Sequence, residues 1–534
     1  MCCFEGKARE TCRRKKGNKL DKKSNIKTYS FILLAILFSK LLGLVRSRCL
    51  AVFYSRSIEA DAFTIASQIP LVFFDVTLGI AVASAFIPVL NGYLGEGKKK
   101  RAFRFANVFL SVTLSMAAIM CLILMIFSDQ AAFLMASQST EETLALASQL
   151  LKIVSPIVFI AVAAYSCVAV LQSLGEFRRP AIMSALSNLA MIAYFLLFND
   201  RFGIQGLAVA LVVGWLCQLA ILIGPLRERG FKFRYVPRLH DEGMSEVGRL
   251  VIPVLLSSWA VPINKILNNN FASTVAGGPV TMDYAYQLFF MVAGVFSMAL
   301  TNLFFPRMSR NYAQGKEKEN FQLLCDMLAN ITMIVMPVLL FFMLFSKEII
   351  RFVYEGGAFT AEDTAVTGII LTCYAAGMVG VSWQEILNKY FYSGHDGKSP
   401  LRVAVVGILV NVVAGYALLQ VLGLPGIAVA ASISITFIGV VLFIMAWKKS
   451  GQPAMPFLKN LAKVALCSVV CGILLAAGSW LIGGFGEGNK IICLVKMGVV
   501  FGITLAIYYG ALVALRTGQA SVLLSLLRKK GTSI

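Results

Sequence analysis

The chain has 534 residues, of which 58% are hydrophobic and only 14% are charged. Long charge-poor runs recur from about residue 28 to residue 515, which excludes an ordinary soluble domain and predicts an all-α, multi-pass membrane protein. The net charge of +22 does not indicate a nucleic-acid partner, because the cations are spread over separate connections instead of lying on one solvated face.

The predicted elements begin with a basic tail at residues 1–27. This stretch is polar and lacks both an apolar core and a cleavage site, so it predicts a cytoplasmic tail and not a signal peptide. The apolar runs that follow predict about fourteen transmembrane helices. The first six form an N-terminal lobe at 28–225, with helices expected at 28–45, 64–93, 105–127, 147–173, 181–198 and 204–225.

A second lobe follows a cytoplasmic linker at 226–249. Six more helices fill residues 250–447, and we expect them at 250–272, 280–305, 323–345, 365–392, 401–422 and 426–447. The last two spans, near 460–482 and 491–515, form a separate helix pair within 459–515. Residues 516–534 are predicted to be a second cytoplasmic tail.

An internal repeat relates the two six-helix lobes. The octapeptide G-I-Q-G-L-A-V-A begins at Gly203, and G-L-P-G-I-A-V-A begins at Gly423. A loop proline precedes the second glycine of each copy by 26 residues, at 180–206 (206−180) and at 400–426 (426−400). Because each lobe holds an even number of spans, the copies have the same orientation and form a parallel pseudo-twofold repeat. Two equivalent lobes are typical of a transporter.

The basic residues alternate between connections, as the positive-inside rule describes. Most of the 49 Lys and Arg lie on the side of the basic leader, in connections such as 98–101, 227–249 and 448–449. The opposite connections contain few, and the stretch 129–146 has acids and no base. We therefore predict that both termini are cytoplasmic.

Catalytic and metal-binding motifs are not evident. The 12 cysteines are scattered, and no outward connection holds a plausible disulfide pair. Only His240 and His395 are present, and both fall in predicted cytoplasmic connections. Without a G-x-S-x-G or Walker motif, the sequence predicts a protein that is not an enzyme and carries no cofactor or metal.

Ionisable residues inside the spans need an explanation, because each costs at least a few kcal/mol unless it faces a partner or a wet cavity. Those inside or at the ends of spans are Lys40, Arg46, Asp75, Lys152, Lys265, Asp283, Glu385, Lys389 and Lys496. Snorkelling to the interface explains Lys152 and Lys496, and can explain Arg46. Glu385 and Lys389 are spaced i,i+4 with the acid first, which favours an ion pair on one helix face.

Lys40 and Lys265 are harder to explain by packing, because neither has an acid within its own helix. Lys265 lies in a polar stretch that also contains Asn264 and Asn268, after the kink expected at Pro262. A solvated cavity between the lobes accommodates these residues, and the alternative is a polar helix interface held by asparagine hydrogen bonds. The supporting polar residues of such a cavity are expected to be Ser39, Asp61, Gln68, Asn264, Asn268 and Gln287. Asp61 is also expected to pair with Arg46 or Arg48.

Several motifs resemble those of one known family. They are S-K-x-x-G-x-x-R from Ser39, D-A-F from Asp61, F-I-P from Phe86, and F-Y-S-G-x-D-x-K-x-P from Phe391. The chain resembles the MurJ/MviN family of lipid II flippases over about its whole length, including the final helix pair. That resemblance implies two six-helix lobes around a central cavity, as in the superfamily that also contains MATE drug exporters and polysaccharide flippases.

The family binds the pyrophosphate of its lipid-linked sugar with cationic residues, mainly on helices one, two and eight. Lys40 stands where the family usually has arginine, whereas Arg46 and Asp61 match the pattern. Residues 73–75 read F-F-D where the second helix usually offers arginine, and Gln287 replaces the arginine of the eighth helix. The resemblance therefore implies that Lys40 and Arg46 bind substrate, and Lys265 is the candidate for the missing charge.

The function that follows is the transfer of a polyprenyl-pyrophosphate glycan, most simply lipid II, from the inner to the outer leaflet by alternating access. The chain is then a bacterial cytoplasmic membrane protein driven by membrane potential or an ion gradient, with the final helix pair as a groove for the polyprenyl tail. Its partners are the lipid-linked glycan and membrane lipids, with cell-wall synthesis enzymes as candidate partners.

Three alternatives remain open from the sequence. One is a flippase for another lipid-linked oligosaccharide, such as a capsule or exopolysaccharide unit. Another is a MATE-type antiporter of cations or drugs, in which Asp75, Asp283 and Glu385 carry the coupling ion. The third is a scaffold that recruits cell-wall enzymes, which predicts that replacing Lys40 and Lys265 together leaves function intact. A basic cavity favours a lipid pyrophosphate, and an acidic cavity favours a cationic drug.

Overall fold

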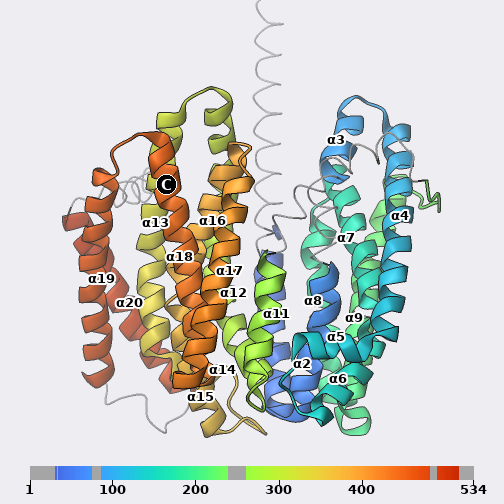
Figure 1. The fold of residues 1–534 in the computed structure, drawn as a ribbon, viewed down its shortest axis with the longest axis horizontal. Coiled ribbons are helices and arrows are strands. Elements are labelled where there is room, and N and C mark those ends of the chain that lie inside the picture. The colour runs from blue at the N-terminus through green and yellow to red at the C-terminus, as the bar shows by residue number, and fades with distance from the viewer. Residues whose placement is uncertain are drawn as a thin grey trace, which may run out of the picture. The chain divides into compact units, whose positions relative to one another are not determined.

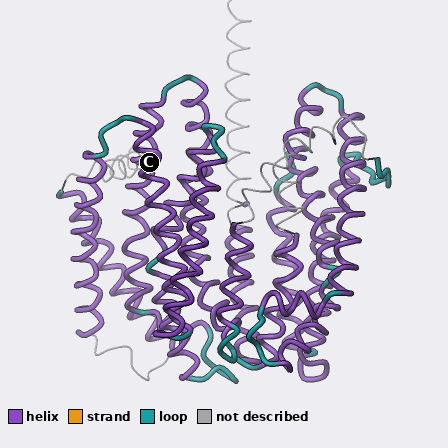
Figure 2. The backbone as a smooth tube through the Cα atoms, in the orientation of Figure 1, coloured by secondary structure: helices purple, strands orange, loops and turns teal. Residues whose placement is uncertain are grey.

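The computed structural model describes residues 31, 32, 34–74, 86–238, 244, 260–481 and 490–515. The regular structure of these residues is helical, apart from one isolated bridge between Gly356 and Phe359. Figure 2 shows this helical backbone, with loops at the connections. The all-α prediction is confirmed. Both predicted tails, the middle of the second predicted span and Asp75 lie outside the described residues.

The helices are those of a multi-pass membrane protein. Among the described residues, eight are long and apolar enough to cross a membrane, and there are up to ten if each of two bent helix pairs forms one span. Large apolar side chains project from them, including Val421 at 79% and Trp480 at 81% exposure. Such exposure is unfavourable in water over many helices and is normal where the helices face lipid. The total of about fourteen spans stays a prediction.

The chain divides into two compact units, each described by itself. The first contains residues 1–49, 73–126 and 153–251, and the second contains residues 50–72, 127–152 and 252–534. Residues 50–72 and 127–152 were both assigned to the N-terminal lobe from the sequence, whereas their contacts place them in the second unit. The two units therefore do not follow chain order strictly.

The first unit is built on five named helices and the helical residues 34–49. The named helices are α3 (Ile87–Gly95), α4 (Lys99–Ile126), α7 (Ile157–Ser173), α8 (Arg178–Leu197) and α9 (Asn199–Glu228). Helix α7 packs against both α4 and α9, and α8 packs along α9. The amide of Asn188 on α8 donates a 3.1 Å hydrogen bond to the carbonyl of Ser39, which joins residues 34–49 to this bundle.

The second unit contains the other named helices, which are labelled in Figure 1. They are α2 (Ile58–Phe74), α5 (Ser128–Met135), α6 (Glu141–Val154), α11 (Ala260–Ala272), α12 (Gly278–Ala313), α13 (Glu317–Leu344), α14 (Ser346–Val353), α15 (Ala361–Ala375), α16 (Met378–Ser393), α17 (Lys398–Leu422), α18 (Leu424–Ser450), α19 (Met455–Leu481) and α20 (Lys490–Ala514). Helix α16 packs against α12, α13 and α18, and α17 packs along α18. The short helices α5 and α14 were not predicted.

The span predicted at 365–392 is two helices, α15 and α16, bent by 42°. The hydroxyl of Ser432 on α18 donates a 2.7 Å hydrogen bond to the carbonyl of Cys373, near the end of α15. Gly377 approaches Ser432 so closely that a Cβ there would lie 2.9 Å from the Ser432 Oγ. The bend therefore places a backbone carbonyl where a side chain of another helix satisfies it.

The repeated glycine motif forms the same turn in both units. Gly203 has φ 55° and ψ −150°, and Gly423 has φ 66° and ψ −145°. Only glycine adopts this region of the backbone map readily, because it has no Cβ. The turn forms a kink near the start of α9 in the first unit and joins α17 to α18 in the second. Sequence identity at these positions is thus explained by one backbone conformation, used twice 220 residues apart (423−203).

The final helix pair packs on α13. A buried apolar cluster joins Cys467 and Cys471 of α19 and Met497 of α20 to Met333 of α13. The hydroxyl of Tyr508 on α20 donates a 3.1 Å hydrogen bond to the Met333 carbonyl. Buried thiols here act as small apolar groups within the helix interface.

Candidate functional site

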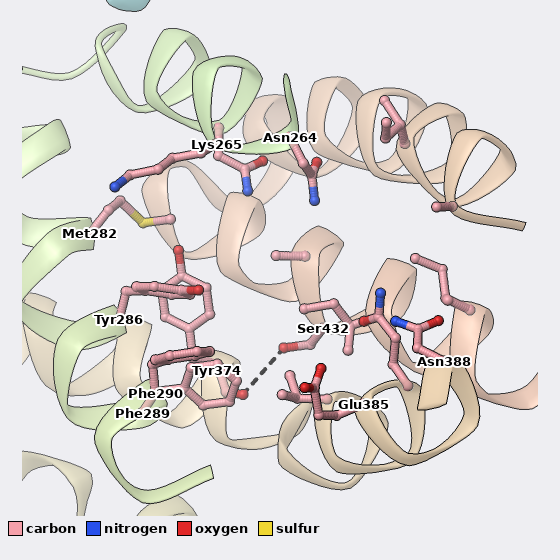
Figure 3. Close-up of a pocket in the computed structure, with 18 of the residues that line it drawn as sticks. Asn264, Lys265, Met282, Tyr286, Phe289, Phe290, Tyr374, Glu385, Asn388 and Ser432 are labelled. Atoms are coloured by element: carbon pink, nitrogen blue, oxygen red, sulfur yellow. Dashed lines mark hydrogen bonds between the residues drawn. The ribbon is translucent and has the colours of Figure 1, made fainter. Parts of the chain in front are cut away.

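The second unit encloses a cavity of about 460 Å³. Seven helices contribute to its lining, namely α2, α11, α12, α15, α16, α17 and α18. Figure 3 shows Lys265 and Asn264 along one side, a group of aromatic rings along another, and Glu385 with Asn388 on a third. A cavity with both polar and aromatic walls, enclosed by membrane helices, is the usual form of a small-molecule or headgroup site.

Helix α11 supplies the amide-rich wall. Asn264, Lys265 and Asn268 line the cavity, and the two asparagines are one helical turn apart. The amide nitrogen of Asn411 on α17 donates hydrogen bonds of 2.6 Å to the Asn264 Oδ1 and 2.7 Å to the Asn268 Oδ1. These bonds hold α11 against α17 in the orientation that places Lys265 in the cavity lining.

Asn411 was not predicted as a site residue. It is fully buried, and its own Oδ1 accepts no hydrogen bond from the described residues. The signal for it in the sequence is a single asparagine within the apolar run 401–422. A buried polar residue in a membrane helix marks a contact with another helix or a cavity.

A chain of side-chain hydrogen bonds links three helices at the cavity. The amide of Asn269 on α11 donates a 2.9 Å bond to the Gln68 Oε1 on α2. The Gln68 amide nitrogen in turn donates a 2.9 Å bond to the Asp283 Oδ1 on α12. Gln68 was predicted as a supporting cavity residue and Asp283 as a possible ion-coupling residue, and both line this cavity.

The aromatic wall consists of Tyr286, Phe289 and Phe290 on α12 and Tyr374 on α15. The rings of Tyr286 and Phe290 stack with centroids 5.7 Å apart, and those of Phe289 and Tyr374 stack at 5.5 Å. Tyr286 keeps 39% and Phe290 keeps 43% of its surface exposed, so the wall offers ring surface to the cavity (Figure 3). None of these four aromatic residues was predicted as a site residue.

Helix α16 supplies the acidic wall. Glu385 lines the cavity together with Gln384 and Asn388. The expected ion pair between Glu385 and Lys389 is not formed, so that prediction was wrong. The Lys389 ammonium lies 5.9 Å from the centre of the Phe305 ring instead, because this face of α16 packs toward α12.

The predicted role of Asp61 also needs correction. Its carboxylate is buried and accepts the backbone N–H of Gly277 at 2.7 Å and that of Val280 at 2.9 Å, at the start of α12. We expected Asp61 to pair with Arg46 or Arg48, which precede it by 15 and 13 residues (61−46 and 61−48). Arg56 is the cation whose charge stabilises the Asp61 carboxylate.

The other predicted site residues lie elsewhere. Ser39, Lys40 and Arg46 belong to the first unit, where Lys40 is exposed and Ser39 is buried. Gln287 is on α12 but outside the cavity lining, and its Oε1 is buried without a hydrogen-bond partner among the described residues. The lining of this cavity in the second unit therefore contains one ammonium, from Lys265, and two carboxylates, from Asp283 and Glu385.

The described residues contain no group of three or more His, Cys, Asp and Glu placed to hold a metal ion. What the cavity offers instead is amide donors and acceptors, one cation, two anions and an aromatic surface. Groups of these kinds are complementary to a polar, charged ligand.

Comparison with known proteins identifies the family. The family model described as "Lipid II flippase MurJ" matches residues 51–495. The protein called "Probable lipid II flippase MurJ" of Bdellovibrio bacteriovorus is 26% identical over 95% of this chain and 97% of its own length. The proteins of the same name from Thermotoga maritima and Buchnera aphidicola (strain APS) are each 27% identical, covering 89% and 88% of this chain and 95% and 94% of their own lengths.

Solved structures agree on the fold. A structure titled "Lipid II flippase MurJ, inward closed conformation" has a TM-score of 0.74 at 22% identity, and covers 90% of this chain and 99% of that chain. An inward-facing MATE family transporter of the MOP superfamily has a TM-score of 0.65 at 15% identity, and covers 79% of this chain and 98% of that chain. The fold is thus the one that these two transporters share. With a family model that matches most of its length, the chain belongs to the lipid II flippase MurJ family.

Proposed function

We propose that the chain translocates lipid II, the polyprenyl-pyrophosphate-linked precursor of peptidoglycan, from the inner to the outer leaflet of the bacterial cytoplasmic membrane. The observation that carries the proposal is the match of the family model over residues 51–495. It is supported by relatives of that name that align over nearly their whole lengths. The role is transport, and no bond of the substrate needs to be made or broken.

The physical problem is the head group. A pyrophosphate with sugar hydroxyls cannot enter hydrocarbon, because burying an unpaired charge there costs far more than binding energy commonly supplies. A cavity with charged and amide side chains replaces part of the hydration shell, as the cavity of the second unit does with Lys265 and its asparagines. The polyprenyl chain stays in the lipid throughout.

Three cations are proposed to bind the pyrophosphate: Lys40, Arg46 and Lys265. Lysine binds phosphate as a point charge with three N–H donors, and arginine adds a planar bidentate fork. Lys265 is exposed on α11 within the cavity, and its helix is held by Asn411. Ser39, Asp61, Gln68, Asn264, Asn268 and Gln287 are proposed to support these residues.

Transport is proposed to follow alternating access between two six-helix lobes, within a total of about fourteen spans. The repeated turn at Gly203 and Gly423 supports a duplication of the helix pairs that contain it. We propose that membrane potential or an ion gradient drives export, since an inside-negative potential favours outward movement of an anion by about 2.3 kcal/mol per charge per 100 mV. Asp75, Asp283 and Glu385 are the candidates for ion coupling.

The final pair, α19 and α20, is proposed to guide the polyprenyl chain. This pair lies outside the repeated block and packs on α13 through apolar side chains, so its other surfaces are available to acyl chains. We further propose that both termini are cytoplasmic and that cell-wall synthesis enzymes are partners.

A second candidate is a MATE-type antiporter of cations. The observation in its favour is the pair of carboxylates against one ammonium in the cavity lining. Likeness to MATE structures at 15% identity supports the fold and not this activity. Drug accumulation in cells that express the chain distinguishes the candidates, because only an antiporter lowers it.

Complementation tests the proposal. The chain is expressed in bacteria depleted of their own lipid II flippase, and outer-leaflet lipid II is measured together with survival. Growth with restored outer-leaflet precursor is the expected result. Lysis despite good membrane insertion would contradict export of lipid II, and rescue of a capsule-flippase mutant instead would indicate another lipid-linked oligosaccharide.

A further inference from the structure

Glu385 is the cavity carboxylate with spare hydrogen-bonding capacity. It lines the cavity on α16, and no ion pair or hydrogen bond within the described residues engages it. Asp283 differs, because its Oδ1 already accepts a hydrogen bond from Gln68. Lys389, one turn from Glu385, lies over the Phe305 ring. Among the described lining residues, Glu385 is therefore the carboxylate that presents an unpaired anion to whatever enters the cavity.

An uncommitted carboxylate is unfavourable for a substrate that carries only negative charge. A carboxylate enclosed by membrane helices costs free energy unless it meets a cation, and it repels a phosphate brought into the same cavity. A head group that also carries an ammonium reverses the sign of this interaction. A primary ammonium donates three hydrogen bonds, and the side-chain amides of Gln384 and Asn388 offer further acceptors beside Glu385.

The aromatic wall fits the same ligand. Tyr286 and Phe290 expose stacked rings to the cavity, and ring faces attract cations and pack against the apolar faces of sugars. Lys265 on α11 supplies the opposite charge along another side of the cavity (Figure 3). The cavity is thus complementary to a head group that has both an anionic group and an amine.

We infer that Glu385 recognises an ammonium on the head group of the transported lipid, such as a free amine on its peptide, and thereby selects amine-bearing head groups over purely anionic ones. This inference rests on the proposed transport of a lipid-linked glycan. It goes beyond that proposal by naming the ammonium as the part of the head group that the second unit recognises. On this inference Glu385 is a specificity residue, which leaves Asp75 and Asp283 as the candidates for ion coupling.

The test uses the purified full chain in liposomes and two probes. One is lipid II whose stem peptide carries a lysine with a free ε-amine, and the other is the same lipid acetylated at that amine. At pH 7 the free amine is charged and the acetylated one is neutral. The initial rate at which each probe reaches the opposite leaflet is measured against probe concentration, which gives an apparent affinity for each.

The expected result is a preference of the unmodified chain for the free amine by roughly 10-fold to 100-fold in apparent affinity. Glu385→Gln should reduce this preference to about twofold or less, chiefly by weakening transport of the free-amine probe, whereas Glu385→Asp should retain part of it. The matched control is Glu362→Gln, at an exposed acid near the start of α15, which should keep the full preference.

Two outcomes would overturn the inference. One is equal transport of both probes by the unmodified chain, a result that needs no variant to fold. The other is a Glu385→Gln variant that loses both probes equally, which is the behaviour of an ion-coupling residue. Transport of neither probe by the unmodified chain would contradict the proposed function itself, so the two failures are distinguishable.

Discussion

The Asp61 carboxylate accepts the backbone N–H of Gly277 at 2.7 Å, although the two residues are 216 positions apart. Its other oxygen accepts the N–H of Val280 at 2.9 Å. Gly277 is the N-cap residue of α12 and has no side chain that can cap the helix. A residue of α2 therefore supplies the acceptor that an N-cap side chain normally provides, and its charge also suits the positive end of the helix.

Removing this cap should destabilise the second unit. Asp61→Ala leaves two buried N–H groups without acceptors, so we expect a loss of about 1 to 2 kcal/mol in folding free energy and a melting temperature lower by a few degrees. Thermal unfolding of the detergent-solubilised protein measures the effect. Glu59→Ala, at an exposed acid of the same helix, is the control. An unchanged melting temperature in Asp61→Ala would contradict the capping role.

Asn411 should matter to both stability and substrate binding. Asn411→Ala removes the bonds that hold Asn264 and Asn268, and we expect a cost of about 1 kcal/mol, in line with side-chain hydrogen bonds between membrane helices. The same change should weaken transport, since Lys265 lies between these asparagines on α11. The measurement is thermal unfolding together with export of lipid II.

A double-mutant cycle separates the contact from other effects of the substitution. Combining Asn411→Ala with Asn264→Ala should cost less than the sum of the single changes, because both remove the same hydrogen bond. Strict additivity of the two single changes would show that the bond contributes nothing to stability.

Local patterns in the sequence predicted many of the helices and the repeat of the glycine motif, although not the turn that the motif forms. The turns at Gly203 and Gly423 follow from short motifs, because a positive φ demands glycine at a fixed position. The apolar run 401–422 corresponds closely to α17 (Lys398–Leu422). Such features depend on residues that are close in the sequence, and composition with spacing is enough to find them.

Partners across long sequence separations were not predicted. Asp61 was expected to pair with a nearby arginine, but two backbone N–H groups of α12 satisfy it. Glu385 and Lys389 have ideal helical spacing for an ion pair, yet packing of α16 turns Lys389 to Phe305. Local spacing says which side chains can meet, and tertiary packing decides which of them do.

The bend between α15 and α16 was missed for a similar reason. No proline in the run 365–392 marks the bend, and the hydrogen bond from Ser432 of α18 to the Cys373 carbonyl stabilises the bent backbone. The amide cluster of α11 was predicted as a polar stretch, but its anchor Asn411 was not, because the two helices are far apart in the sequence.

Truncation tests the role of the final helix pair. Deleting residues from Asn460 onward should stop export while the rest of the protein still inserts and folds. The face of α13 that loses α19 would then contact lipid, which is as apolar as the helix it replaces. Export of lipid II and monodispersity in detergent are the measurements. The control deletes only residues 516–534. Normal export by the longer deletion would contradict the proposal that α19 and α20 guide the polyprenyl chain.

Asp396 gives a pH-dependent prediction outside the membrane helices. Partial burial raises the pKa of the Asp396 carboxyl. The hydrogen bonds that it accepts from the Ser399 N–H at 3.0 Å and Oγ at 2.9 Å, together with the nearby Lys449 ammonium, outweigh this effect and hold the pKa of Asp396 below its usual value. A carboxyl with a lowered folded-state pKa stabilises the fold above its unfolded pKa of about 3.9. That stabilisation is lost as the pH falls through the folded-state pKa.

Asp396→Asn should therefore lower the melting temperature at neutral pH. The difference in melting temperature between the variant and the unmodified protein should become smaller as the pH falls below about 4. Thermal unfolding between pH 3 and pH 8 measures this difference. Glu228→Gln, at an exposed acid, should show little difference at any pH. A gap between Asp396→Asn and the unmodified protein that widens toward low pH would contradict the assignment.

The measurement that tests the account most directly is outer-leaflet lipid II in flippase-depleted cells that express the chain with Lys40→Gln and Lys265→Gln together. Both lysines are exposed, and the account predicts that export falls by roughly tenfold or more because the pyrophosphate loses two charged donors. The matched control replaces the exposed Lys318 and Lys459 with glutamine and should export normally. Undiminished export by the Lys40 and Lys265 variant, at equal abundance in the membrane, would contradict the account and favour a scaffold function.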